Sequence, residues 1–165
     1  MERIQLPSFE IPSKLYRIHY AGSQTGCDDG GFWAVELRYC TSVSRALETI
    51  ESHVNWWSNE PSPWISTFSN RAAAENWALT WKRNNNGQDC DVVEIDGSRL
   101  LDCLIVRVRD VLHPMERPYS SMEYLVLHHV PQDAIVRWKS TRHLEVGMSS
   151  WESVSAEGMV LTRLV

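Results

Sequence analysis

Three short apolar segments carry polar residues at places where an apolar residue or a turn would be expected in an ordinary strand. Arg17 is in the middle of "LYRIHY", Ser66 and Thr67 are in "WISTFS", and Glu123 opens "EYLVLHHV". A buried arginine is costly unless it is paired, so Arg17 either points to solvent or faces an anion. Each position also has a structural interpretation: a surface arginine, a serine that caps the next helix, and a solvated or salt-bridged glutamate.

Two amphipathic helices are predicted between these segments. The first is "TSVSRALETIESHVNWW", with Ser42 or Ser44 as its N-cap and an apolar face made of Val43, Ala46, Leu47, Ile50, Val54 and Trp57. The prolines of "SNEPSP" end this helix. The second is "NRAAAENWALTWKR", with Asn70 as its cap. Trp77 and Trp81, four residues apart, indicate a core-facing side of the second helix rather than a binding surface.

The other apolar segments are predicted to be strands, at 14–20, 31–39, 64–69, 90–96, 103–112, 122–130 and 157–165. Residues 21–31 are rich in Gly and Asp and are predicted to form a loop, and 132–138 a short helix or strand. Because the strands do not alternate with helices, the pattern favours an α+β fold with mainly antiparallel pairing over a doubly wound parallel sheet.

The composition is that of an ordinary soluble domain, with 43% hydrophobic and 22% charged residues among 165. The net charge of −5 argues against a general nucleic-acid binder, but not against action on one nucleotide or base. Because the sequence lacks GxxxxGK[ST], GxGxxG and CxxC, no P-loop, Rossmann site or structural zinc site is indicated. Without a membrane-length apolar run or a signal peptide, we expect a cytoplasmic protein with free thiols, unless another route exports it.

In their order along the chain, these motifs resemble the ADP-ribosyltransferase superfamily. "LYR", an amphipathic helix, "ISTFS" leading into a helix, a strand ending in "EID" and "MEYLVLHHVPQDAI" follow one another between Leu15 and Ile135. The order is most similar to the branch with an Arg–Ser–Glu triad, which includes pierisin-like and cholera-toxin-like toxins, and to fungal domains of the same layout. The resemblance implies split antiparallel β-sheets with flanking helices, in a single domain over 1–165 whose core spans about 14–138.

The resemblance also implies NAD as the substrate, no metal, and a role for each residue. Arg17 would grip phosphate oxygens. Glu123 would stabilise the oxocarbenium-like state that forms as the bond from ribose to nicotinamide breaks, and Ser66 would hold Glu123 through its hydroxyl. Phe68 or Trp64 would stack on the nicotinamide. Further contacts to NAD are expected from Tyr16, His19 and Thr67.

The sequence does not identify the acceptor of ADP-ribose, which is a protein side chain or a nucleic-acid base. The loop "HPMERPYSS" is expected to recognise it, with Tyr119 and Ser121 as contacts. Ser121 stands where related arginine-modifying enzymes carry Glu, and Phe68 replaces the third residue of their Ser-Thr-Ser motif. NAD glycohydrolase activity and an inactive nucleotide- or protein-binding module therefore stay open, as does a Trp-rich carbohydrate- or peptide-binding domain. His53 is interpreted as structural, and the oligomeric state does not follow from the sequence.

Overall fold

The computed structural model describes residues 10–38, 42–55, 58–112, 121–145 and 152–153. The strands in this part of the chain are β1 (Lys14–His19), β2 (Thr25–Asp28), β3 (Gly31–Ala34), β4 (Trp64–Phe68), β5 (Asp91–Asp96), β6 (Ile105–Arg107), β7 (Glu123–Leu127), β8 (His129–Pro131), β9 (Ile135–Ser140) and β10 (Glu152–Ser153). The helices are α1 (Val43–Val54), α2 (Arg71–Asn84), α3 (Val108–Val111) and α4 (Thr141–Glu145), with 3-10 turns η1 (Gly97–Leu100) and η2 (Gln132–Ala134).

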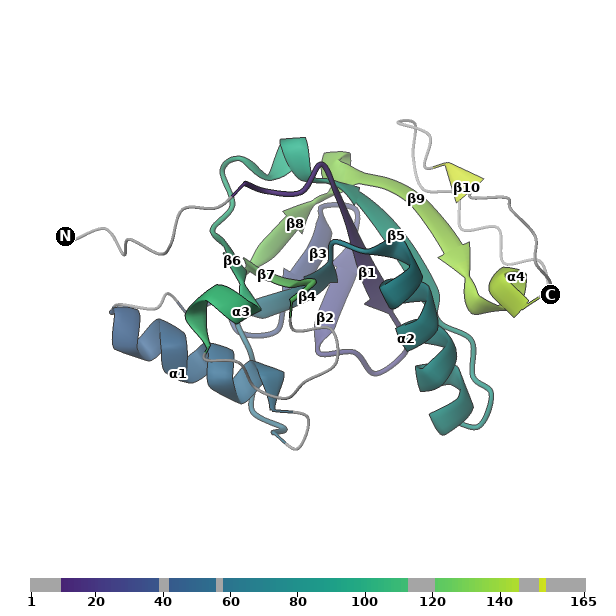
Figure 1. Ribbon diagram of the computed structural model, residues 1–165, viewed down its shortest axis with the longest axis horizontal. Coiled ribbons are helices and arrows are strands. Elements are labelled where there is room, and N and C mark those ends of the chain that lie inside the picture. Colours follow the sequence, from purple (N-terminus) through teal and green to yellow (C-terminus); the bar gives the residue numbers. More distant parts are fainter. Residues whose placement is uncertain (1–9, 39–41, 56–57, 113–120, 146–151, 154–165) are drawn as a thin grey trace.

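The strands form two antiparallel sheets in one α+β domain, as the order of predicted elements indicated. The large sheet has the order β10-β9-β5-β1-β4-β7-β6, and the small sheet has the order β2-β3-β8. Apolar side chains of both sheets share one core, which includes Leu15, Phe32, Val93, Ile95 and Val130. The helices α1 and α2 pack on the same face of the large sheet, α1 around Trp64 and α2 around Phe68 of β4, and the small sheet covers the other face. In Figure 1, α1 and α2 lie apart at the two sides of the view, and α4 lies beside β9.

Both predicted helices are present with the predicted caps. Ser42 accepts a hydrogen bond from the backbone N–H of Arg45, and Asn70 accepts one from the N–H of Ala73. The face of α1 is shorter than expected, because Ala46, Ile50 and Val54 are buried but Val43 is exposed. Trp57 lies outside the described residues. Trp77 and Trp81 of α2 are half-buried and pack on Tyr20.

Two predicted segments differ from the structure because a residue in each takes a positive φ, which the pattern of apolar and polar side chains does not indicate. The predicted loop at 21–31 contains β2, which pairs with β3 through a hairpin whose Gly31 has a positive φ of 113°. The predicted strand at 122–130 is interrupted by His128, whose φ is 62°. This left-handed residue sends β7 into the large sheet and β8 into the small one.

The predicted strand at 103–112 is also shorter than expected, because β6 ends at Arg107 and α3 follows. The predicted strand at 157–165 lies outside the described residues. Cys27, Cys90 and Cys103 are free thiols, and Cys40 lies outside the described residues.

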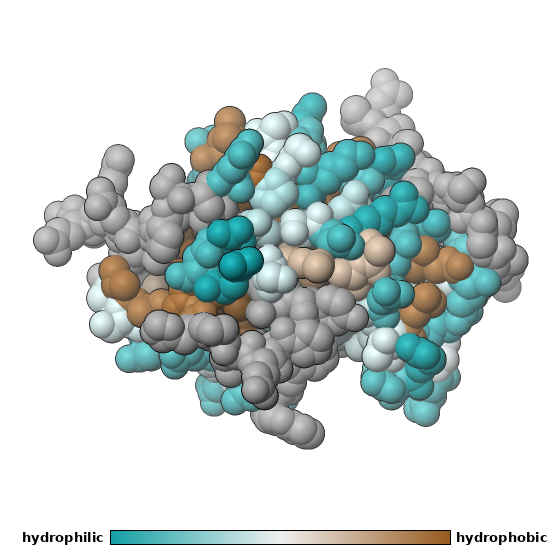
Figure 2. Space-filling model, viewed as in Figure 1, coloured by the Kyte–Doolittle hydropathy of each residue, from teal (hydrophilic) through white to brown (hydrophobic). Residues whose placement is uncertain are grey.

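Figure 2 shows that the face viewed in Figure 1 is largely hydrophilic, with hydrophobic areas where α1 and α2 lie. Within the described ranges, no helix is both long enough and apolar enough to cross a membrane.

Candidate functional site

The large sheet opens between the neighbouring strands β1 and β4. β1 pairs with β5 from Lys14 to His19, whereas its register with β4 is Tyr16 opposite Phe68. Beyond this point a pocket lies between the two strands, with α1 on one side and α2 on the other. Its cavity volume is about 230 Å³. Small-molecule pockets typically measure ~300–1,000 Å³, so a larger ligand would extend out of this one.

Arg17 is a buried cation in this pocket. Only 4% of the residue is exposed, and its guanidinium reaches across the opening. Nη1 donates to the carbonyl of Ser66 at 3.0 Å, and Nη2 donates to the hydroxyl of Ser23 at 3.2 Å. Cζ lies 5.3 Å from the centre of the Phe32 ring. Nε is buried without a hydrogen-bond partner.

Arg17 therefore carries a charge that no neighbouring carboxylate balances within the described part of the chain. Burial lowers the pKa of its guanidinium to about 10, so the group stays protonated at neutral pH. The neighbouring His19 does not supply a counter-charge. Burial and the positive charge of Arg17 lower the pKa of His19 to about 4, so this imidazole is neutral at pH 7. A buried cation without a counter-ion is suited to an anionic ligand.

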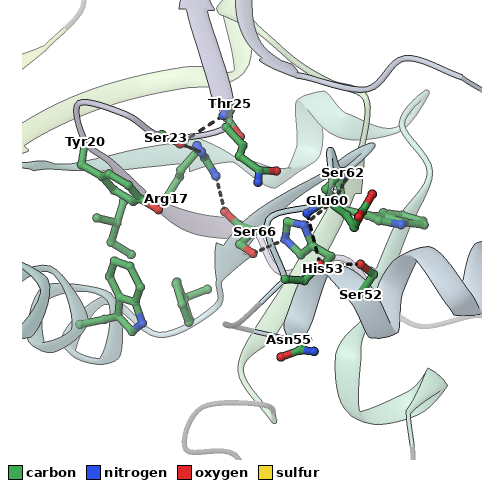
Figure 3. Close-up of a pocket in the computed structure, with 16 residues that line it drawn as sticks. Arg17, Tyr20, Ser23, Thr25, Ser52, His53, Asn55, Glu60, Ser62 and Ser66 are labelled. Atoms are coloured by element: carbon green, nitrogen blue, oxygen red, sulfur yellow. Dashed lines mark hydrogen bonds between the residues drawn. The ribbon is translucent and has the colours of Figure 1, made fainter.

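Ser66 contacts both Glu123 and His53, the histidine that was expected to have only a structural role. The hydroxyl of Ser66 donates to Oε1 of Glu123 at 3.1 Å, so the expected serine–glutamate contact is present. Nε2 of His53 lies 2.8 Å from the same hydroxyl, and its Nδ1 lies 2.6 Å from the hydroxyl of Ser62. Figure 3 shows His53 between the two serines, which extend from β4 and from the segment before it.

The hydrogen-bond directions in this network fix one tautomer of His53. The hydroxyl of Ser66 donates its one proton to Glu123, so it accepts from Nε2–H of His53. In the neutral imidazole with this tautomer, Nδ1 accepts from the hydroxyl of Ser62, which itself accepts from the backbone N–H of Trp64 at 3.1 Å. No sequence pattern indicated this role of His53, because Ser62 and Ser66 lie 9 and 13 residues away and contact it only in the fold.

The pocket has two chemically different ends, as Figure 3 shows for Tyr20 and Glu60. We call the first the aromatic end, and it is formed by Tyr20, Phe68 and Trp77. The second, the polar end, adjoins the C-terminus of α1 and is formed by Ser52, Asn55, Ser58 and Glu60. Arg17, Ser66 and His53 lie between the two ends.

Three residues that were expected to contact NAD do not line this pocket. Tyr16 is buried against α2, where burial raises the pKa of its hydroxyl. Thr67 is fully buried and donates to the carbonyl of Tyr124, because it faces the opposite side of β4 from Ser66. His19 shares a face of β1 with Arg17, as predicted, but its ring packs on Phe32 and Trp138.

The remaining predicted residues are placed as follows. Phe68 lines the pocket at its aromatic end, opposite Glu123 in the register of β4 and β7. Trp64 also borders the pocket, but it is 1% exposed and its indole N–H donates to Thr49. Ser121 is exposed just before β7, and Tyr119 lies outside the described residues.

The Ser66–His53 contact also has the length of a nucleophile–base pair, as in serine hydrolases. Two features argue against that chemistry. The proton of Ser66 is directed to Glu123 rather than to His53, and Nδ1 of His53 meets a hydroxyl where a triad has a carboxylate. The network therefore positions a carboxylate. Among the described residues, no group of three or more His, Cys, Asp or Glu side chains is arranged to hold a metal ion.

Most of the chain matches one known protein family. A family described as "Domain of unknown function (DUF7587)" matches residues 10–143. The chain belongs to this family. The DUF7587 match includes all four residues of the pocket network, Arg17, His53, Ser66 and Glu123. No curated protein matches the chain.

Proposed function

We propose that this DUF7587 domain is a mono-ADP-ribosyltransferase that cleaves NAD at its nicotinamide–ribose bond. The observation that carries the proposal is a buried arginine without a carboxylate partner, Arg17, which donates to the carbonyl of Ser66. The hydroxyl of the same Ser66 contacts both Glu123 and His53. Arg17 suits the pyrophosphate of NAD, because a guanidinium can donate in parallel to two phosphate oxygens. The resemblance of the sequence to Arg–Ser–Glu transferases assigns the same three residues.

Glu123 would act on the bond that breaks. As C1′ of the ribose separates from the ring nitrogen, the bonding electron pair moves to that nitrogen and neutralises the pyridinium. Positive charge develops on the ribose, and the carboxylate of Glu123 stabilises it. A nucleophile of the acceptor then bonds to C1′ and releases its proton. The balanced products are ADP-ribosylated acceptor, nicotinamide and one proton.

Ser66 and His53 would act through Glu123 as positioning residues. Donation from Ser66, which lines the pocket, occupies one lone pair of the Glu123 carboxylate and restricts its orientation. His53 holds Ser66 in turn, because its second nitrogen is anchored by Ser62. Loss of His53 would thus lower the rate of bond cleavage more than the affinity for NAD.

The acceptor is a protein side chain or a nucleic-acid base, with Ser121 and Tyr119 proposed to contact it. When no acceptor binds, water takes its place and the same site acts as an NAD glycohydrolase. The small, open pocket is consistent with both outcomes, since part of a dinucleotide would stay accessible. No metal is needed for either reaction.

The test is release of nicotinamide from NAD labelled in its adenine half, with and without a cell lysate. The wild type is compared with His53→Ala and with Glu51→Ala, which changes an exposed residue of the same helix that does not line the pocket. We expect release by the wild type and at least tenfold slower release by His53→Ala. Label on macromolecules indicates transfer, and free ADP-ribose alone indicates hydrolysis. If the wild type released no nicotinamide with or without lysate, the proposed catalysis would be wrong, and a nucleotide-binding module would be the remaining interpretation.

A further inference from the structure

We infer that Glu60, at the polar end of the pocket, makes this site select NAD over NADP. The two dinucleotides differ only at the 2′ position of the adenosine ribose, where NADP carries a phosphate. The inference rests on the proposed function, because it assumes that Arg17 binds the pyrophosphate and that Glu123 meets the nicotinamide ribose.

The strand register gives the direction in which the dinucleotide lies. Glu123 is opposite Phe68 in the pairing of β7 with β4, and Phe68 belongs to the aromatic end. The nicotinamide ribose must approach Glu123, so the nicotinamide half lies toward the aromatic end. Arg17 lies between the two ends and holds the pyrophosphate. The adenosine half then extends toward the C-terminus of α1, which is the polar end.

The polar end is built from hydroxyl, amide and carboxylate groups that are tied to α1. The hydroxyl of Ser58 lies 2.9 Å from that of Ser52 on α1. The same Ser58 hydroxyl accepts from the backbone N–H of Glu60 at 3.3 Å, and the N–H of Ser58 donates to the carbonyl of Asn55. These contacts hold the backbone of Glu60 against the end of the helix, beside the pocket that it lines.

The charges along the pocket favour a ribose diol over a 2′-phosphate at this end. Arg17 is the single Lys or Arg among the described residues that line the pocket, and the pyrophosphate already uses it. A carboxylate accepts hydrogen bonds from ribose hydroxyls, which is how dinucleotide sites on other folds recognise NAD. A 2′-phosphate carries about −1.5 to −2 charges at pH 7 and would meet Glu60 without a compensating cation.

The test uses ADP-ribose and 2′-phospho-ADP-ribose, which have the relevant ribose but no bond to nicotinamide that the enzyme can break. Dissociation constants are measured by calorimetry for the wild type, for Glu60→Gln, and for Glu51→Gln. Glu51 is an exposed carboxylate of α1 that does not line the pocket, so its variant controls for a general change in charge. Each protein is measured at low salt and near 0.5 M salt.

We expect the wild type to bind ADP-ribose at least tenfold more tightly than its 2′-phosphate. Glu60→Gln should tighten the 2′-phosphate about tenfold at low salt, with less effect at high salt, because an exposed charge is screened. Glu51→Gln should match the wild type. Binding of ADP-ribose with an unchanged ratio in Glu60→Gln would overturn this inference alone. Failure of the wild type to bind either ligand would overturn the proposed function, and this inference with it.

Discussion

The unpaired charge of Arg17 predicts that its removal is nearly neutral for stability while it abolishes ligand binding. Arg17→Met keeps a long apolar stem over Phe32 and deletes the guanidinium. Burial lowers the pKa of Arg17 from 12.5 to about 10, which corresponds to about 3 kcal/mol of unfavourable free energy for the charged form. Against this gain stands the loss of hydrogen bonds to Ser66 and Ser23, each contributing about 1.5 kcal/mol, which is the low end for a charged donor because the distances are 3.0 and 3.2 Å. We expect the free energy of unfolding to change by no more than about 1 kcal/mol.

The assay is urea unfolding followed by tryptophan fluorescence, together with calorimetry of ADP-ribose binding. Arg137→Met is the matched control, because Arg137 pairs with both carboxylate oxygens of the buried Glu94, at 2.9 and 2.8 Å. Lys14 alone would then face Glu94, and we expect a loss of about 2–4 kcal/mol. If Arg17→Met instead lost 3 kcal/mol or more and still bound ADP-ribose, Arg17 would be a structural brace and the reasoning would be wrong.

Three further predictions concern stability and are each measured by urea unfolding. The pKa of His19 is about 4 in the fold and ~6.5 when unfolded, so only the unfolded chain takes up a proton as the pH falls from ~6.5 to 4. The free energy of unfolding of the wild type should fall by about 1–2 kcal/mol over that pH range, a figure that allows for the residual solvent contact of His19. It should fall less in His19→Gln, and an equal fall in the two proteins would refute this prediction. Gly31→Ala should cost more than about 3 kcal/mol, because φ is 113° and a Cβ would overlap the carbonyl oxygen of Val130; a change below about 1 kcal/mol would contradict it. Asn70→Ala should lower the free energy of unfolding by about 1 kcal/mol because it removes the N-cap of α2, whereas Asn70→Asp should retain most of the wild-type stability.

The elements that depend on side-chain periodicity were predictable from the sequence. The helices α1 and α2, with their caps Ser42 and Asn70, follow from apolar spacing and from the preference of Ser and Asn for N-caps. The split of one predicted strand into β7 and β8 was not predictable, because it depends on the backbone of His128 in a left-handed conformation. β2 was missed for a similar reason, since its Gly and Asp residues are typical of turns.

The candidate site was predictable where a residue type was unusual for its segment. Arg17 and Ser66 stood out in apolar strands, and both line the pocket. Tyr16 and Thr67 were expected to contact NAD, yet they face the other side of their strands from Arg17 and Ser66, and both lie in the core. His53 was missed because its significance arises from contacts with Ser62 and Ser66, which bring a helix and a strand together.

The central claim is that Glu123 stabilises the breaking nicotinamide–ribose bond without being needed to bind NAD. The measurement that tests it most directly compares Glu123→Gln with the wild type under saturating NAD, recording nicotinamide release and, by calorimetry, the dissociation constant of ADP-ribose. Gln keeps the shape of the side chain and can accept from Ser66, but it lacks the negative charge. We predict a loss of release of about 100-fold or more, with a dissociation constant within about threefold of wild type. Release by Glu123→Gln at the wild-type rate would contradict the account.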